Sequence, residues 1–205
     1  MPIDRLRSRA ELALAGRVYI GNGAAAGVVL PIFSNVTQQF GLWNPAGNDR
    51  WAEIFEVGLG SYVDTTGATG GFVLAIVKEA PANTATGAAG ISAFTRTVPE
   101  NAVPGLESKN KVIFGVGATL TVTAPIIYRH LHINQDVIPV TSVVQQAIRG
   151  PVAEFPDRSV WLPPGNAIFL AGNIATLAKY APTIVWGEHD AKELADFLAA
   201  VGLAA

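Results

Sequence analysis

Residues 36–77 read VTQQFGLWNPAGNDRWAEIFEVGLGSYVDTTGATGGFVLAIV, and this stretch sets the pattern for most of the chain. Runs rich in β-branched and aromatic residues alternate in it with two clusters of turn-forming residues, NPAGND at 44–49 and DTTGATGG at 64–71. Such runs favour extended strands, and Gly, Pro, Asn and Asp favour the turns between them. The stretch therefore predicts successive strands joined by hairpin connections.

The same alternation extends outward from this stretch, from residue 17 to about residue 189, with a turn cluster roughly every ten residues. The 13 prolines and 21 glycines of the chain stand almost entirely between the apolar runs. We predict an all-β fold, an antiparallel β-sandwich. Its strands are expected at 17–20, 27–33, 37–43, 52–63, 71–77, 111–122, 126–133, 140–144, 167–171 and 178–187.

The first residues of the chain have a different period. Residues 3–15 place apolar side chains about every 3.6 positions, which is typical of a short helix, and Gly16 is expected to end it. The apolar stripe consists of Ile3, Leu6, Ala10, Ala13 and Leu14. We interpret this segment as an arm attached to the sandwich.

The last residues predict a second helix. Asp190 and Glu193 have the D-x-x-E spacing of a capping box with Asp190 as the N-cap, and Gly202 is expected to end the helix. Its apolar stripe consists of Leu194, Phe197, Leu198 and Val201. The predicted organisation is an N-terminal arm (1–16), a β-sandwich domain (17–189) and a C-terminal helix (190–205).

The composition indicates a subunit of an assembly. Of the 205 residues, 14 are Lys or Arg and 16 are Asp or Glu, and the net charge of -2 excludes a strongly basic surface that coats nucleic acid. Charged residues make up 15% of the chain, where about 25% is usual. A chain with so little charge is expected to cover part of its surface with other protein.

Two features that the sequence lacks exclude further classes of site and partner. The chain has no cysteine, which excludes disulfides, thiolate metal sites and cysteine nucleophiles. No export signal follows the N-terminal arginines, and no apolar run approaches the roughly 20 residues that span a bilayer. We therefore expect neither a membrane nor a nucleic acid as partner.

One histidine pair suggests a metal site. His130 and His132 point to the same face of a strand, and Asp136 follows, an arrangement that resembles half of the first cupin motif. The glycine expected before the pair is Ala124. The second motif keeps Pro163 and Gly165, but its ligand position holds Ile168. We predict no bound metal and no cofactor, and keep a cupin-like metal-binding or carbohydrate-binding module as the alternative function.

Other reactive constellations are incomplete. The sequence has no G-x-S-x-G, and Gly115-Val116-Gly117 lacks the remainder of a phosphate loop. Glu53 and Glu56 could form a pair of catalytic carboxylates, but their odd spacing predicts opposite faces of a strand. The four tryptophans, which could line a sugar-binding cleft or close the core, are Trp43, Trp51, Trp161 and Trp186. We predict no catalytic residues and no enzymatic activity.

The alternation along the strands also predicts an apolar core between two sheets. The residues expected to face it are Trp43, Phe55, Val57, Phe72, Leu74, Ile113, Leu120, Ile168 and Trp186.

Two segments carry a resemblance to a known family. In residues 36–77 a strand ends in the L-x-N-P-x-G pattern, and a Gly-rich loop leads to a third strand. Residues 160–188, VWLPPGNAIFLAGNIATLAKYAPTIVWGE, contain an apolar-x-PG-x-apolar strand and a closing strand that ends in Trp-x-Glu. Together they resemble jelly-roll decoration or minor capsid proteins of tailed bacteriophages.

The resemblance implies that the antiparallel β-sandwich is jelly-roll-like. It also implies a virion structural protein, assembled in the host cytoplasm, that binds the phage head by protein–protein contacts. The implied partners are the major capsid protein and further copies of the chain, with a trimer expected and a host glycan as an open alternative. We expect attachment to use the two terminal segments, and residues 1–15 to be dispensable for folding of the β body. The candidate interface residues are Arg5, Arg7, Arg9, Leu6, Leu14, Leu194, Phe197 and Leu198.

Overall fold

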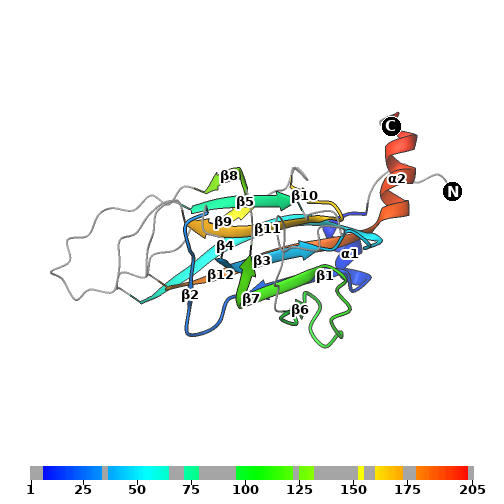
Figure 1. The fold of residues 1–205 in the computed structure, drawn as a ribbon. Helices are drawn as coiled ribbons and strands as arrows, with labels where there is room; N and C mark the ends of the chain where they lie inside the picture. The colour runs from blue at the N-terminus through cyan, green and yellow to red at the C-terminus, as the bar shows by residue number, and fades with distance from the viewer. Residues whose placement is uncertain are drawn as a thin grey trace.

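The structure is a computed structural model that describes residues 7–33, 37–64, 72–78, 96–121, 125–131, 152–154, 160–172 and 179–202. Two short helices lie at one end of a body of antiparallel strands (Figure 1). The helices are α1 (Arg9–Leu14) and α2 (Ala191–Ala200). The strands are β1 (Val18–Asn22), β2 (Val28–Val29), β3 (Thr37–Asn44), β4 (Arg50–Asp64), β5 (Phe72–Lys78), β6 (Glu100–Asn101), β7 (Ile113–Thr121), β8 (Ile126–Leu131), β9 (Val152–Glu154), β10 (Trp161–Leu162), β11 (Asn166–Gly172) and β12 (Lys179–Asp190).

These strands form two sheets. The seven-stranded sheet has the order β10-β4-β12-β1-β6, with β9 paired to β4 and β2 paired to β12. The five-stranded sheet has the order β7-β3-β11-β5-β8. The prediction of an all-β sandwich is confirmed.

The strand pairing is that of a jelly roll. Four antiparallel pairs are nested within one another along the chain: β1 with β12, β3 with β11, β4 with β9 and β10, and β5 with β8. Such nesting is what a long hairpin gives when it is rolled into two facing sheets, each with four of the eight principal strands. The residue pattern therefore predicted the two-layered sandwich, and the resemblance predicted its jelly-roll connection.

Two additional strands extend the sheets on one side. Residues 96–121 lie between β5 and β8 in the chain and supply β6, which pairs with β1, and β7, which pairs with β3. Since β1 and β3 would otherwise be the edge strands, this segment adds one strand to each sheet at the same side of the sandwich.

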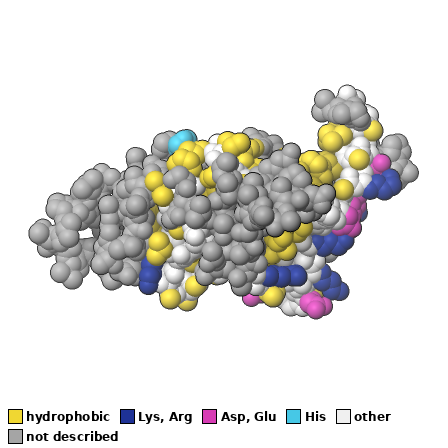
Figure 2. Space-filling model, viewed as in Figure 1, with side chains coloured by type: hydrophobic (Ala, Val, Ile, Leu, Met, Phe, Trp, Pro, Cys, Tyr) yellow, Lys and Arg dark blue, Asp and Glu magenta, His cyan; other side chains and the backbone are white. Residues whose placement is uncertain are grey.

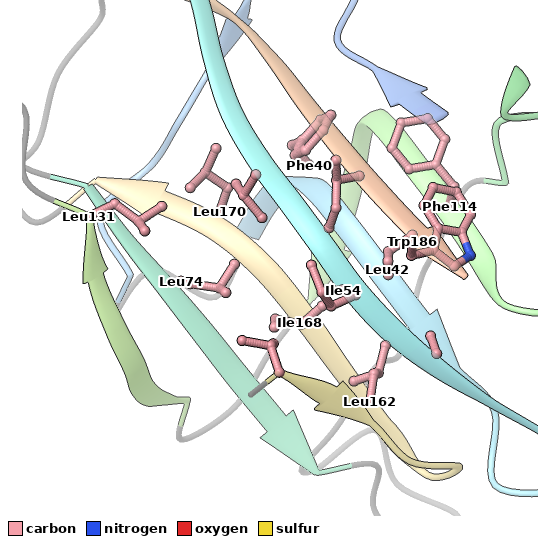
Figure 3. Packing of buried hydrophobic residues seen from close by; sticks show 14 of the residues in the cluster. Phe40, Leu42, Ile54, Leu74, Phe114, Leu131, Leu162, Ile168, Leu170 and Trp186 are labelled. Carbon is pink, nitrogen blue, oxygen red and sulfur yellow. The ribbon is translucent and has the colours of Figure 1, made fainter. Parts of the chain in front are cut away.

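The main core lies between the two sheets (Figure 3). Alternate residues of each strand face it, as the period of two requires. Phe40 and Phe114 meet edge to face with ring centroids 5.5 Å apart, and Phe114 also lies 6.0 Å from Trp186. Among the residues expected in this core, those confirmed are Val57, Phe72, Leu74, Ile168 and Trp186.

Three of the expected core residues face elsewhere. Trp43 follows the inward-facing Leu42 and packs against a second apolar cluster, on the outer face of the five-stranded sheet. Ile113 is half-buried, because Val112 and Phe114 on either side of it are the residues that point inward. Phe55 is buried, but on the outer face of the seven-stranded sheet. The side chain of Leu120 lies outside the described residues.

A β-bulge explains the position of Phe55. Ile54 lies opposite Trp186, but Glu56 rather than Phe55 lies opposite Val185, so the register shifts by one residue. Val185, opposite Glu56, belongs to the outer cluster, and Gly187, opposite Glu53, lies two residues further along β12 on the same face. Glu53 and Glu56 are therefore both on the outer face. The expectation that these two carboxylates lie on opposite faces is therefore wrong, because the extra residue of a bulge reverses the alternation beyond it.

Helix α1 covers that outer face. Leu12 is fully buried against Val18, Phe55 and Val185. The helix begins with a capping box that the sequence analysis missed: Ser8 Oγ accepts from the Glu11 amide at 3.3 Å, and Glu11 Oε2 accepts from the Ser8 amide at 2.7 Å. α1 is thus shorter than expected and packs on the sandwich through Leu12, whereas Ala10 and Leu14 of the expected stripe are exposed.

One expected strand and three unexpected ones need comment. The expected strand at 140–144 lies outside the described residues. The short strands β6, β9 and β10 were not expected, because two or three residues carry no detectable period.

A close approach of backbones makes Gly41 a test of the strand packing. A Cβ at this position would lie 2.5 Å from the Ile168 carbonyl oxygen, which belongs to the neighbouring strand and cannot rotate away. We expect Gly41→Ala to lower the free energy of unfolding by about 1–3 kcal/mol, as overpacking does. Gly47→Ala is the control, since nothing lies within 4 Å of its Cβ position. Equal urea midpoints for the two variants would contradict this packing.

The burial of Leu12 yields a second prediction. Leu12→Ala is expected to lower the free energy of unfolding by about 2–5 kcal/mol, because it removes a fully buried side chain from beneath α1. Leu14→Ala makes the same change on the same helix at a residue that is 84% exposed, and should change stability by less than about 0.5 kcal/mol. Urea titration of both variants measures the difference. If Leu12→Ala is as mild as Leu14→Ala, α1 does not belong to the folded body.

Candidate functional site

Charged residues from four parts of the chain meet at one end of the sandwich, where β4 begins and β12 ends. We call this region the helical end and define it by α1, α2, Arg17, Arg50 and residues 187–190. Figure 2 shows basic and acidic side chains interleaved at this end, and Figure 1 shows α2 projecting from it. β12 runs into α2 without a loop, because Asp190 is both the last strand residue and the N-cap of the helix.

Asp190 is held by two arginines. Its Oδ2 accepts from Arg17 Nη1 at 2.6 Å, and its Oδ1 lies 2.5 Å from Arg50 Nη1. Arg50 is also the residue opposite Asp190 in the β4–β12 ladder. This carboxylate therefore joins the start of β1, the start of β4 and the end of β12.

The predicted capping box at Asp190 does not form. The N-cap position is correct, but the Asp190 side chain makes no capping hydrogen bond, because both of its oxygens face arginines. The amide of Ala191 donates instead to the carbonyl of Asp49 at 2.9 Å. Glu193, the expected box partner, pairs with Arg7 at 2.7 Å and with Arg17 at 3.6 Å.

A buried pair lies directly beside this network. His189 Nε2 is 2.7 Å from Glu53 Oε2, and the two side chains are 0% and 1% exposed. The ring of Trp161 lies 5.1 Å from that of His189, between centroids. Among the described residues, His189 Nδ1 has no hydrogen-bond partner. The pair joins β4 to the last residues of β12 before α2.

A His–carboxylate pair can act as a general base when a nucleophile and substrate reach the free ring nitrogen. Neither side chain of this pair is accessible to a substrate, so in this conformation the pair holds two strands together. Sequence reasoning considered Glu53 only with Glu56 and did not single out His189. The 136 positions that separate Glu53 from His189 left no spacing signal for it.

Glu188 is a further carboxylate of the helical end, and its side chain points inward. Its Oε1 accepts from the amides of Lys111 and Val112 at 3.1 and 3.0 Å, and from Trp186 Nε1 at 3.4 Å. Burial raises the pKa of Glu188 above its ordinary value, although these donors oppose the shift. Glu188 thus anchors the residues that lead into β7, and the Lys111 ammonium contacts Asp49 at 2.6 Å nearby. That hydrogen bond lowers the pKa of Asp49.

The raised pKa of Glu188 predicts a pH dependence of stability. As pH rises past the ordinary glutamate value, the unfolded chain releases its proton before the folded chain does, so this group's contribution to stability falls until the folded pKa is passed. We expect Glu188→Gln, which removes the ionisation and keeps one acceptor oxygen, to flatten the loss of stability in that window. Urea titrations across the acid range test this. Glu100→Gln on exposed β6 is the control, and parallel curves for Glu188→Gln and the parent would contradict the prediction.

The predicted interface residues lie as follows. Arg7 pairs with Glu193 of α2, and the Arg9 guanidinium lies 5.3 Å from the Phe55 ring centroid. Leu14 is exposed, Leu194 is buried, and Phe197 and Leu198 are half-buried on α2. Arg5 and Leu6 lie outside the described residues. The structure brings the two predicted helices together at one end, which the sequence did not indicate.

The cupin-like arrangement is not formed by the residues that are described. His130 is exposed and lies opposite Val73, whose side chain belongs to the outer cluster of the five-stranded sheet. It therefore faces away from the interior in which a cupin metal would sit. Ile168, at the second motif's ligand position, is buried in the core. Within the described ranges no three potential His, Asp or Glu ligands come together, and His132 and Asp136 lie outside those ranges.

The tryptophans do not form one platform. Trp186 is in the core, Trp43 packs on the outer face of the five-stranded sheet, and Trp161 contacts His189 at the helical end. Trp51 lies opposite His189 in the ladder, on the seven-stranded sheet. The four tryptophans therefore do not line one common sugar-binding cleft.

The fold and the helical end define a jelly-roll β-sandwich with a helix projecting from one end. Comparison of the chain with protein-family models, with curated proteins and with solved structures gives no match. Among the residues the structure describes, neither helix is long and apolar enough to cross a membrane.

Proposed function

We propose that the protein is a structural subunit that works by protein–protein contacts, and that it self-associates. The observation that carries the proposal is a set of large apolar side chains left exposed on a chain in which only 15% of residues are charged. The most exposed of them are Leu14 (84%), Val98 (72%) and Ile126 (68%). Isolated exposed apolar residues are ordinary, so their arrangement decides the matter.

Two groups of apolar side chains lie close to the helical end. The methyl group of Leu106 lies 3.4 Å from the Cβ position of Gly16, and Leu14 is two residues before that glycine, so Leu14 and Leu106 flank the end of α1. On α2, Phe197, Leu198 and Val201 recur at helical spacing, and only Leu194 is buried. Both surfaces adjoin the helical end. Association there would remove apolar area from water.

The finer proposal is that the subunit belongs to the virion of a tailed bacteriophage, as a decoration protein bound to the major capsid protein. It is supported by the sequence resemblance of residues 36–77 and 160–188 and by the jelly-roll pairing, a fold that many capsid proteins and lectins share. Because the fold is shared among unrelated functions, the virion assignment needs its own test.

Self-association is tested by sedimentation velocity and native mass spectrometry of the purified chain in the micromolar range. We expect a homo-oligomer, with three copies as the specific expectation. The double variant Leu14→Ser with Val201→Ser should shift it toward monomer, since each change removes an exposed apolar side chain without touching the core. Lys109→Ser, at another exposed position, is the control. A parent chain that is monomeric at all concentrations would sink the proposal of self-association.

The virion assignment is tested by co-sedimentation with empty heads of the phage whose genome encodes the chain. Saturable binding at a fixed copy number per head supports a decoration protein. No binding to heads, or stoichiometric metal in elemental analysis of the purified chain, would instead favour the cupin-like or carbohydrate-binding alternative.

A further inference from the structure

We propose that α2 is a hinged arm whose direction is set by an electrostatic latch, which we define as Glu193 held by Arg7 and Arg17. The latch opens when these ion pairs are screened or when an anionic partner competes for the arginines. The proposal concerns the isolated chain and goes beyond the proposed function, which says nothing of how α2 is positioned.

The strand side of the hinge is fixed. The β4–β12 ladder continues to the pair Asp190–Arg50, and the residue before it, His189, is fully buried on Glu53. Asp190 is in addition bound to Arg17. The Ala191 amide also donates to the Asp49 carbonyl at 2.9 Å, so the backbone is anchored up to that amide. Because no loop follows, any change in the direction of α2 must occur at Ala191.

The helix side of the hinge has little packing. Leu194 is the one buried residue of α2, and Phe197 and Leu198, one turn further on, are only half-buried. In Figure 1 the helix stands clear of the sandwich at one end of the molecule. Apolar burial is the usual main source of helix stability in proteins, and in α2 it is complete only at Leu194, near the start of the helix.

The latch acts on that same first turn. Glu193 Oε1 lies 2.7 Å from Arg7 Nη2, and Oε2 lies 3.6 Å from Arg17 Nη1. Arg17 is itself fixed, because its guanidinium binds Asp190 and its carbonyl accepts from the Glu188 amide. All three side chains of the latch are partly exposed, so salt screens their attraction: the Debye length falls from about 10 Å at 0.1 M to about 3 Å at 1 M.

The residues around the hinge have two different roles. The buried pair and the ladder keep the end of β12 rigid. Within the described ranges, Glu193 is the one charged residue of α2 that forms an ion pair with the body. The other charged residues of the helix, Lys192 and Asp196, pair with each other at 2.6 Å. Opening the latch turns the apolar face of Phe197, Leu198 and Val201 in a different direction without disturbing the sandwich.

The absence of cysteine allows a direct measurement. Spin labels are attached to Glu100→Cys on β6 and Ala199→Cys on α2, both exposed positions, and the label-to-label distance distribution is measured by pulsed electron paramagnetic resonance. Labelled chain is diluted in excess unlabelled chain, so that distances between copies do not contribute. We expect a narrow distribution at about 0.1 M salt and a broad one at about 1 M.

Glu193→Gln should give the broad distribution already at low salt and make it independent of salt. Lys192→Gln is the matched control: it breaks an ion pair of the same helix turn that does not reach the body, and it should behave as the parent does. Circular dichroism checks that α2 stays helical in both variants. The proposal would be overturned by a distance distribution that changes neither with salt nor with Glu193→Gln. Equal broadening by the two variants, or loss of helix on opening, would also overturn it. A monomeric chain with a salt-sensitive distribution would fail the proposed function and leave the hinge intact.

Discussion

The antiparallel pairing of β4 with β12 is the constraint on which the rest of the structure depends. It joins the first third of the chain to its last strand and places β12 at the centre of the seven-stranded sheet, between β4 and β1. Once β4 lies beside β12, the chain between them must fold back on itself, and it does so by pairing β8 with β5 and by returning β9 to β4. The same ladder delivers Arg50, Glu53, His189 and Asp190 to one end, and so creates the helical end.

Burial of polar groups around this ladder is tolerated because nearly all of them are paired. Asn44 donates to the carbonyls of Arg50 and Leu162 at 2.8 and 2.9 Å, and so closes the junction of β3, β4 and β10. Glu188 receives backbone amides from the residues that lead into β7. A buried polar group without a partner would be costly, so these side chains specify which strand ends meet. Two buried atoms of the helical end have no hydrogen-bond partner among the described residues, His189 Nδ1 and Arg50 Nη1, and the second of them forms an ion pair with Asp190.

Local patterns were enough to predict most strands and both helices, since period and turn residues are properties of neighbouring positions. They failed where a distant residue changes the outcome. Ser8 with Glu11 and Asp190 with Glu193 have the same capping spacing, yet only the first pair forms a box, because Arg17 and Arg50 hold the Asp190 carboxylate. Phe55 faces α1 rather than the core because of a bulge that no periodic reading of β4 reveals. The His189–Glu53 pair required the register of the whole ladder.

The shortness of β6 bears on how copies of this chain can associate. Within the described residues, the seven-stranded sheet ends on this strand, which is only two residues long. A long bare edge is a template on which further chains can add strand after strand, as in fibrils, whereas a two-residue edge offers almost no backbone to extend. Growth without limit is therefore blocked at this edge, and association there would have to use side-chain surfaces, which favours closed complexes of fixed size.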